Sequence, residues 1–138
     1  MIRVVLDTNV VISAHLNAGG LENLVFKLAI HRFLELCLSG PILSEYERVL
    51  ASRKFSFEPV KVKTSLAQIR KASTLVDPPH ILSICSDEAD NRFLECAEVA
   101  GADFLITGNK QHFPQRWKST SVVNAREFIE FITGGLKR

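Results

Sequence analysis

Short runs of apolar residues with few polar interruptions constrain the fold of this 138-residue chain most strongly. Residues 2–6 are mostly β-branched and apolar, and residues 104–107 form a similar run. Strands that are buried on both faces have this composition, because neither face needs polar side chains. Parallel sheets covered by helices contain such strands, so the sequence predicts an α/β protein.

Segments with helical periodicity separate these runs. Apolar residues recur at helical spacing in residues 21–31 and 87–100, and Gly101 is placed to end the second helix. The full prediction is, in chain order, strand 2–6, helix 21–31, strand 33–38, helices 42–50 and 60–73, strand 75–76, helix 87–100, strands 104–107 and 121–123, and helix 125–132. This order predicts a three-layer α/β/α sandwich around a central, mostly parallel, Rossmann-like sheet.

Length and composition indicate one domain over residues 1–138. The formal net charge of +2 neither indicates nor excludes a nucleic-acid partner, because a local basic patch is sufficient for phosphate contact. No stretch approaches the roughly 20 apolar residues of a membrane span, and the start of the chain is typical of a strand rather than a signal peptide. Cys37, Cys85 and Cys96 are widely spaced, which favours buried thiols in a reducing cytoplasm over disulfides or a zinc site.

Acidic and amide residues recur where such a fold places the carboxyl ends of its strands. Asp7 closes strand 2–6, Glu45 lies in the helix after the second strand, and Asp90 lies near the start of helix 87–100. Ligands bind at this edge of open α/β sheets. Carboxylates gathered there would repel one another, and a bound Mg²⁺ or Mn²⁺ would remove that repulsion. Further polar residues at the same edge are Asn9, Asp87, Thr107 and Asn109.

Each acid also has a purely structural explanation. Asp7 could form a turn, Asp87 could cap a helix, and Asp90 could complement a helix dipole. Glu45 could be a solvated helix residue. The combination of Asp-Thr-Asn at residues 7–9 with the later acids favours the metal site.

Four segments, residues 4–13, 44–50, 87–97 and 101–110, resemble the PIN domain family, and especially its VapC-like toxin branch. The final strand and helix are also similar, so the resemblance spans nearly the whole chain. It implies Mg²⁺- or Mn²⁺-dependent cleavage of RNA, with 5′-phosphate and 3′-hydroxyl products. It also implies a small antitoxin partner and a homodimer. Asp7, Glu45 and Asp90 match the family's metal-binding acids, and Asn9 matches the polar residue beside the first acid.

The chain departs from the family pattern after Thr107-Gly108, where Asn109 replaces a fourth acid and Gln111 replaces another frequent acid. An amide carries no charge, so we expect weaker binding of a second metal ion. Asp87 could supply the missing charge. For RNA phosphates, Lys110 is the first candidate and Arg92 the second.

Several other side chains are candidates for contact with RNA. His112 could touch the substrate or a metal-bound water. Aromatic rings could stack on bases, with core packing expected for Phe113 or Trp117. The additional candidates are Arg53, Lys54, Phe55, Phe57, Arg116 and Lys118.

Three alternatives compete with the ribonuclease interpretation. The first is a catalytically weakened PIN-like module that binds RNA or protein, which Asn109 favours. The second is a phosphatase with an Asp nucleophile. That class needs a second Asp where Asn9 stands, and a Lys that Lys110 matches only loosely. The third is a flap-type DNA nuclease, but such enzymes are usually longer, with helices that thread a strand.

Overall fold

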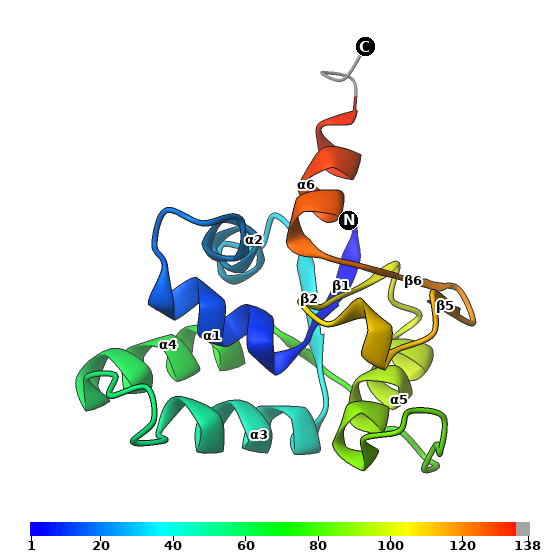
Figure 1. The fold of residues 1–138 in the computed structure, drawn as a ribbon, viewed down its shortest axis with the longest axis horizontal. Helices are drawn as coiled ribbons and strands as arrows, with labels where there is room; N and C mark the ends of the chain where they lie inside the picture. The colour runs from blue at the N-terminus through cyan, green and yellow to red at the C-terminus, as the bar shows by residue number, and fades with distance from the viewer. Residues whose placement is uncertain (135–138) are drawn as a thin grey trace.

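The computed structural model describes residues 1–134 and contains a six-stranded sheet with helices on both sides (Figure 1). The strands lie in the order β3-β2-β1-β4-β6-β5. Neighbouring strands are parallel except for β5 and β6. The strands are β1 (Arg3–Leu6), β2 (Glu35–Leu38), β3 (Thr74–Leu75), β4 (Phe104–Ile106), β5 (Arg116–Trp117) and β6 (Thr120–Val123). The predicted α/β sandwich with a mostly parallel sheet is confirmed.

Helices α1 and α2 lie on one side of β1 and β2, and α5 lies on the other (Figure 1). The helices are α1 (Thr8–Leu16), α2 (Leu21–Ile30), α3 (Gly40–Leu50), α4 (Pro59–Ala72), α5 (Asn91–Ala100) and α6 (Ala125–Ile132). Two short 3-10 helices, η1 (Glu88–Asp90) and η2 (Lys110–His112), precede α5 and follow β4. Within residues 1–134, no helix combines the length and the apolar character needed to span a bilayer.

The register of the central strands brings their carboxyl ends together. Leu6 of β1 pairs with Ile106 of β4, which in turn pairs with Val123 of β6. The residues that follow β1 and β4 therefore emerge side by side at one edge of the sheet. This edge is where the acidic residues were predicted to gather.

Helix α1 corrects the sequence prediction, which placed no helix between residues 7 and 21. Its side chains Val10, Val11, Ile12 and Ala14 are all buried. A helix that is enclosed on most sides needs no polar face, so the periodic pattern that identifies a surface helix is absent.

Smaller corrections concern element ends. The predicted helix over residues 87–100 is the 3-10 turn η1 followed by α5, and the third strand is shifted by one residue to Thr74–Leu75. β5 was not predicted, because a two-residue strand carries no periodic signal. Gly101 ends α5 as expected, with a left-handed φ of 62°.

The three cysteines are free thiols. Cys37 and Cys96 are buried, and Cys85 is only partly so. The partial exposure of Cys85 departs from the prediction that all three thiols are buried.

Candidate active site

Asp7 lies at the carboxyl end of β1 and immediately before α1, and its side chain is only 6% exposed. Its main-chain N–H donates to the Ile106 carbonyl of β4 at 2.9 Å. The Thr107 hydroxyl donates to Asp7 Oδ2 at 2.7 Å, and Asn9 Nδ2 donates to the same oxygen at 3.2 Å. Thr107, which follows β4, and Asn9, in the first turn of α1, thus fix the orientation of this carboxylate.

Asn9 joins the loop after β4 to the start of α1. Its side-chain carbonyl accepts a hydrogen bond from the Gly108 N–H at 2.9 Å. A Cβ at Gly108 would lie 3.4 Å from that same oxygen, which is close van der Waals contact. The Asn109 N–H donates to the Thr107 hydroxyl at 3.0 Å, which leaves the hydroxyl proton free to point at Asp7.

Glu45 reaches this edge from α3. The Thr8 hydroxyl donates to its carboxylate, and Arg48 lies 3.9 Å from its other oxygen. The next residue, Tyr46, is fully buried and donates its hydroxyl to the Leu6 carbonyl at the end of β1. The roles of Thr8 and Tyr46 were not predicted from the sequence; only the position of Thr8 beside Asp7 could have suggested one.

Asp90 is the last residue of η1, and its Oδ2 atom is buried without a hydrogen-bond partner. The His112 ring lies near it, with Nδ1 3.6 Å from this oxygen. His112 was one of the predicted candidates, and the structure places it against Asp90. Asp87 accepts a hydrogen bond from the Ala89 N–H at 3.0 Å, so it caps the turn that carries Asp90.

The acids at this edge affect one another's ionisation. Burial raises the pKa of Asp7 to about 6, and the charges of Asp90 and Glu45 add to the rise, whereas the hydrogen bond from Thr107 opposes it. Burial and the charge of Asp87 raise the pKa of Asp90, and His112 opposes that rise. The negative charges are therefore close enough to destabilise one another.

The three acids do not form a preassembled coordination shell. Within the described residues, no group of three or more His, Cys, Asp or Glu side chains is arranged so that it could hold a metal ion. The donor chemistry still fits a hard divalent cation, because the three acids offer carboxylate oxygens, the charges of Asp90 and Glu45 act on Asp7, and Asp90 Oδ2 is buried without a protein donor. Metal binding by Asp7, Glu45 and Asp90 stays a prediction.

The two cations predicted to contact RNA are already paired with carboxylates. Lys110 Nζ lies 2.9 and 2.8 Å from the two Glu127 oxygens. Arg92 Nη2 lies 2.7 Å from Glu88 and 2.8 Å from Glu95. An RNA phosphate would have to compete with these carboxylates, and both RNA contacts stay predictions.

The aromatic candidates lie in different surroundings. Phe113 is part of the hydrophobic core, as expected for one of the pair, and Trp117 donates its indole N–H to Glu98 at 2.9 Å. Phe55 and Phe57 stack on each other beyond the end of α3, with ring centroids 5.7 Å apart. Within the part of the chain that the structure describes, none of the four makes a hydrogen bond or a ring contact with the acids at the sheet edge.

A shallow cavity of about 230 Å³ lies beside Asn9, which bonds Asp7, but none of the three candidate acids lines it. Asn9, Ser13, Gly108 and Asn109 line it, together with Glu22 from α2. Sequence analysis did not place Glu22 near the site, because it follows no strand.

Comparison with known proteins gives three matches. The sequence profile of the PIN domain matches residues 3–111. The uncharacterized protein MJ1680 of Methanocaldococcus jannaschii is 31% identical over 112 residues, which cover 79% of this chain and 72% of that protein. A chain in the crystal structure of VapBC2 from Rickettsia felis, bound to a DNA fragment from their promoter, has a TM-score of 0.60 at 17% identity. That match covers 89% of this chain and 98% of the other, and it shows a shared fold.

Proposed function

The chain belongs to the PIN domain family, and from this premise we propose that it is an endoribonuclease dependent on Mg²⁺ or Mn²⁺. Asp7, Glu45 and Asp90 would hold the cation, and RNA phosphodiesters would be its substrate. Hydrolysis would add water to the phosphorus and release the 3′ oxygen as a hydroxyl, which leaves a 5′-phosphate on the other product.

One observation carries the proposal: Asp90 and Glu45 lie close enough to the buried Asp7 for their charges to raise its pKa, and the pKa of Asp90 is raised as well. Asp90 Oδ2 in particular is buried without a donor. Such an arrangement is unfavourable unless a positive group completes it, because like charges in a buried site raise one another's pKa. A site that binds a divalent cation and a phosphate explains the arrangement.

The residues of the chain have separate tasks in this proposal. Thr107 and Asn9 hold Asp7 in a fixed orientation, and Thr8 does the same for Glu45. When bound, the cation would neutralise charge on the phosphate and make a nearby water more acidic. Lys110 would exchange its contact with Glu127 for an RNA phosphate beside Asn109.

The shared fold with a chain of VapBC2 supports a role as the toxin of a toxin–antitoxin pair. We propose that a small antitoxin protein inhibits the nuclease, and that the chain acts in the cytoplasm as a homodimer. Copurification with the product of an adjacent small gene, and the mass of the purified protein in solution, test these two assignments.

The competing function is a module that binds RNA or protein without cleaving it. Asn109 favours this alternative, because it places an amide where the family pattern has an acid. The three remaining acids and their mutual repulsion favour the nuclease.

Cleavage of labelled total RNA and transfer RNA, with Mg²⁺, Mn²⁺ or EDTA, decides between the two. We expect cleavage with either metal and none with EDTA. Asp90→Asn should lower the rate at least 100-fold, by analogy with the loss of a single charge-stabilising group. Glu58→Gln changes an exposed acid whose side chain caps no helix and should cleave at the wild-type rate. RNA binding without cleavage under all conditions would establish the non-catalytic module instead.

A further inference from the structure

The segment that leads to Asp90 has no regular structure. It runs from the end of β3 to the start of η1. In the described part of the chain, the main-chain groups of residues 77–86 make no hydrogen bonds to other main-chain groups. Main-chain N–H groups that are withdrawn from water need partners, and in this segment the hydrogen bonds come from side chains.

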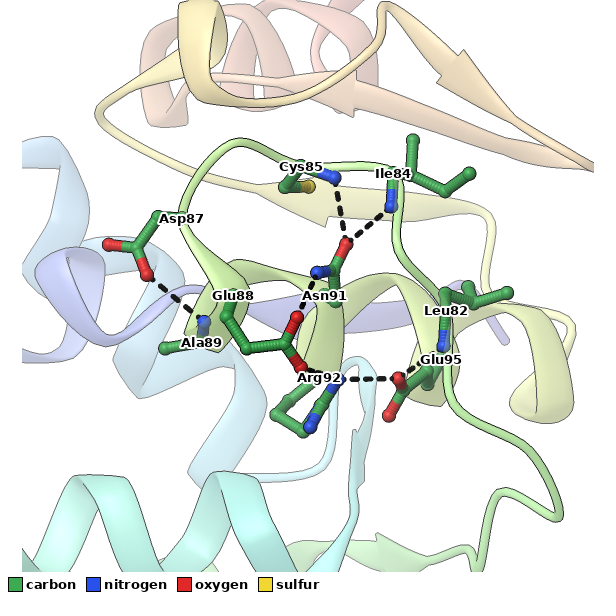
Figure 2. Close-up of polar contacts among 9 residues, drawn as sticks. All are labelled: Leu82, Ile84, Cys85, Asp87, Glu88, Ala89, Asn91, Arg92 and Glu95. Carbon is green, nitrogen blue, oxygen red and sulfur yellow. Dashed lines mark hydrogen bonds and ion pairs between the residues drawn. The ribbon is translucent and has the colours of Figure 1, made fainter.

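Two side chains of α5 supply those partners (Figure 2). Asn91 Oδ1 accepts from the N–H groups of Ile84 and Cys85, at 2.9 and 2.8 Å. Glu95 Oε2 accepts from the N–H of Leu82 at 2.7 Å. Asn91 is fully buried and Glu95 is only 6% exposed. The two residues lie one helical turn apart, so both face the same segment.

The same two residues are tied to the turn that carries the candidate acid. Asn91 Nδ2 donates to Glu88 Oε2 at 3.1 Å. Arg92 bridges Glu88 and Glu95, as Figure 2 shows. Asp90 directly precedes Asn91. The start of α5 therefore carries the candidate acid and also binds the segment of residues 77–86 through hydrogen bonds.

We propose that Asn91 and Glu95 are positioning residues that hold Asp90 toward Asp7. This inference rests on the proposed function, because orienting Asp90 matters only if Asp90 binds the metal ion. Mutation of residues that hydrogen-bond to metal ligands and orient them typically weakens metal affinity about 10- to 100-fold. Burying the Asn91 amide and the Glu95 carboxylate costs free energy unless their hydrogen bonds are made. Here those bonds are made to the segment that leads to Asp90.

Mn²⁺ binding measured by isothermal titration calorimetry tests the proposal, with amide hydrogen exchange over residues 82–90 as a second readout. We expect Asn91→Ala and Glu95→Ala to weaken Mn²⁺ binding by about 10- to 100-fold and to speed exchange in this segment. Glu95→Gln keeps an oxygen for the Leu82 N–H and should stay within about threefold of wild type. If Asn91→Ala does not fold, the comparison of Glu95→Ala with Glu95→Gln provides the same test.

Leu94→Ala is the matched control, because Leu94 is a fully buried apolar residue of the same helix. It should lower stability and leave Mn²⁺ affinity unchanged. Wild-type Mn²⁺ affinity in a folded Asn91→Ala variant would overturn this inference, and so would equal weakening of Mn²⁺ binding in Leu94→Ala. Either result would leave the proposed function standing. Wild-type protein that binds no Mn²⁺ would overturn the proposed function and, with it, the role assigned to Asn91 and Glu95.

Discussion

Asp7 illustrates how a single residue is stabilised and destabilised by the same surroundings. Its carboxylate receives hydrogen bonds from Thr107 and Asn9, which favour the ionised form. Its burial and the charges of Asp90 and Glu45 favour the protonated form, and burial is the largest effect. The result is a carboxyl group whose pKa lies close to the working pH of a cell.

This pKa predicts how stability depends on pH in the absence of metal. Because the pKa of Asp7 is about 6 in the folded protein and 3.8 as the ordinary value, the folded state binds the proton more tightly. The free energy of unfolding should therefore fall as pH rises from about 4 to about 6, by on the order of 2–3 kcal/mol. Asp7→Asn carries no charge and should lack this fall.

Urea unfolding in EDTA, at steps between pH 4.5 and 7.5, measures the effect. We expect Asp7→Asn to be more stable than wild type at pH 7 and to gain nothing from added Mn²⁺. If the variant were less stable than wild type at pH 7, the burial of Asp7 would not be destabilising its charged form.

At the scale of elements, the end of α5 depends on one glycine. Gly101 adopts a left-handed φ of 62°, and an added Cβ would meet nothing closer than Arg3 Nη1 at 4.0 Å. Gly101→Ala should therefore cost about 1 kcal/mol from backbone strain alone. Gly40, which opens α3 with open space around it, provides the control, and Gly40→Ala should be neutral or stabilising. The urea concentrations at the unfolding midpoints of the two variants compare their stabilities directly. Equal midpoints would contradict the predicted strain at residue 101.

The elements also show what sequence can and cannot predict. The runs at β1 and β4 were identifiable because strands buried on both faces lack polar residues, and the rule that ligands bind at strand ends then predicted Asp7 and Asp90 at one edge. Helix α1 was missed because its buried side chains surround the helix. The roles of Asn91 and Glu95 depend on the path of residues 77–86, and an irregular segment has no periodicity that would predict its path.

Charge is distributed unevenly over the whole molecule. Seven of the 17 Lys and Arg, but only two of the 15 Asp and Glu, lie between residues 46 and 72, in α3, α4 and their connection. The formal net charge of +2 conceals this basic region, which begins beside Glu45. Because α3 carries both Glu45 and part of this basic region, the region is a candidate for contact with the phosphates of a bound RNA.

This distribution predicts how RNA binding depends on salt. Replacing Arg53 and Lys54 together by Ala should weaken binding and reduce the slope of log affinity against log salt by about two, if both contact phosphates. Lys27→Ala removes an exposed cation of α2, outside the basic region, and should change neither quantity. Fluorescence anisotropy with a labelled single-stranded RNA and a catalytically silent Asp90→Asn background provides the measurement. An unchanged slope in the double variant would place the RNA elsewhere.

The hydrogen bond between Thr107 and Asp7 joins residues that are 100 positions apart in the chain. Proteins are synthesised from the amino end, so Asp7 leaves the ribosome long before Thr107 has been added to the chain. Until β4 has emerged and paired with β1, the first acid has neither its donor nor its neighbouring strand. The proposed active site therefore cannot form before residues 104–107 have left the ribosome.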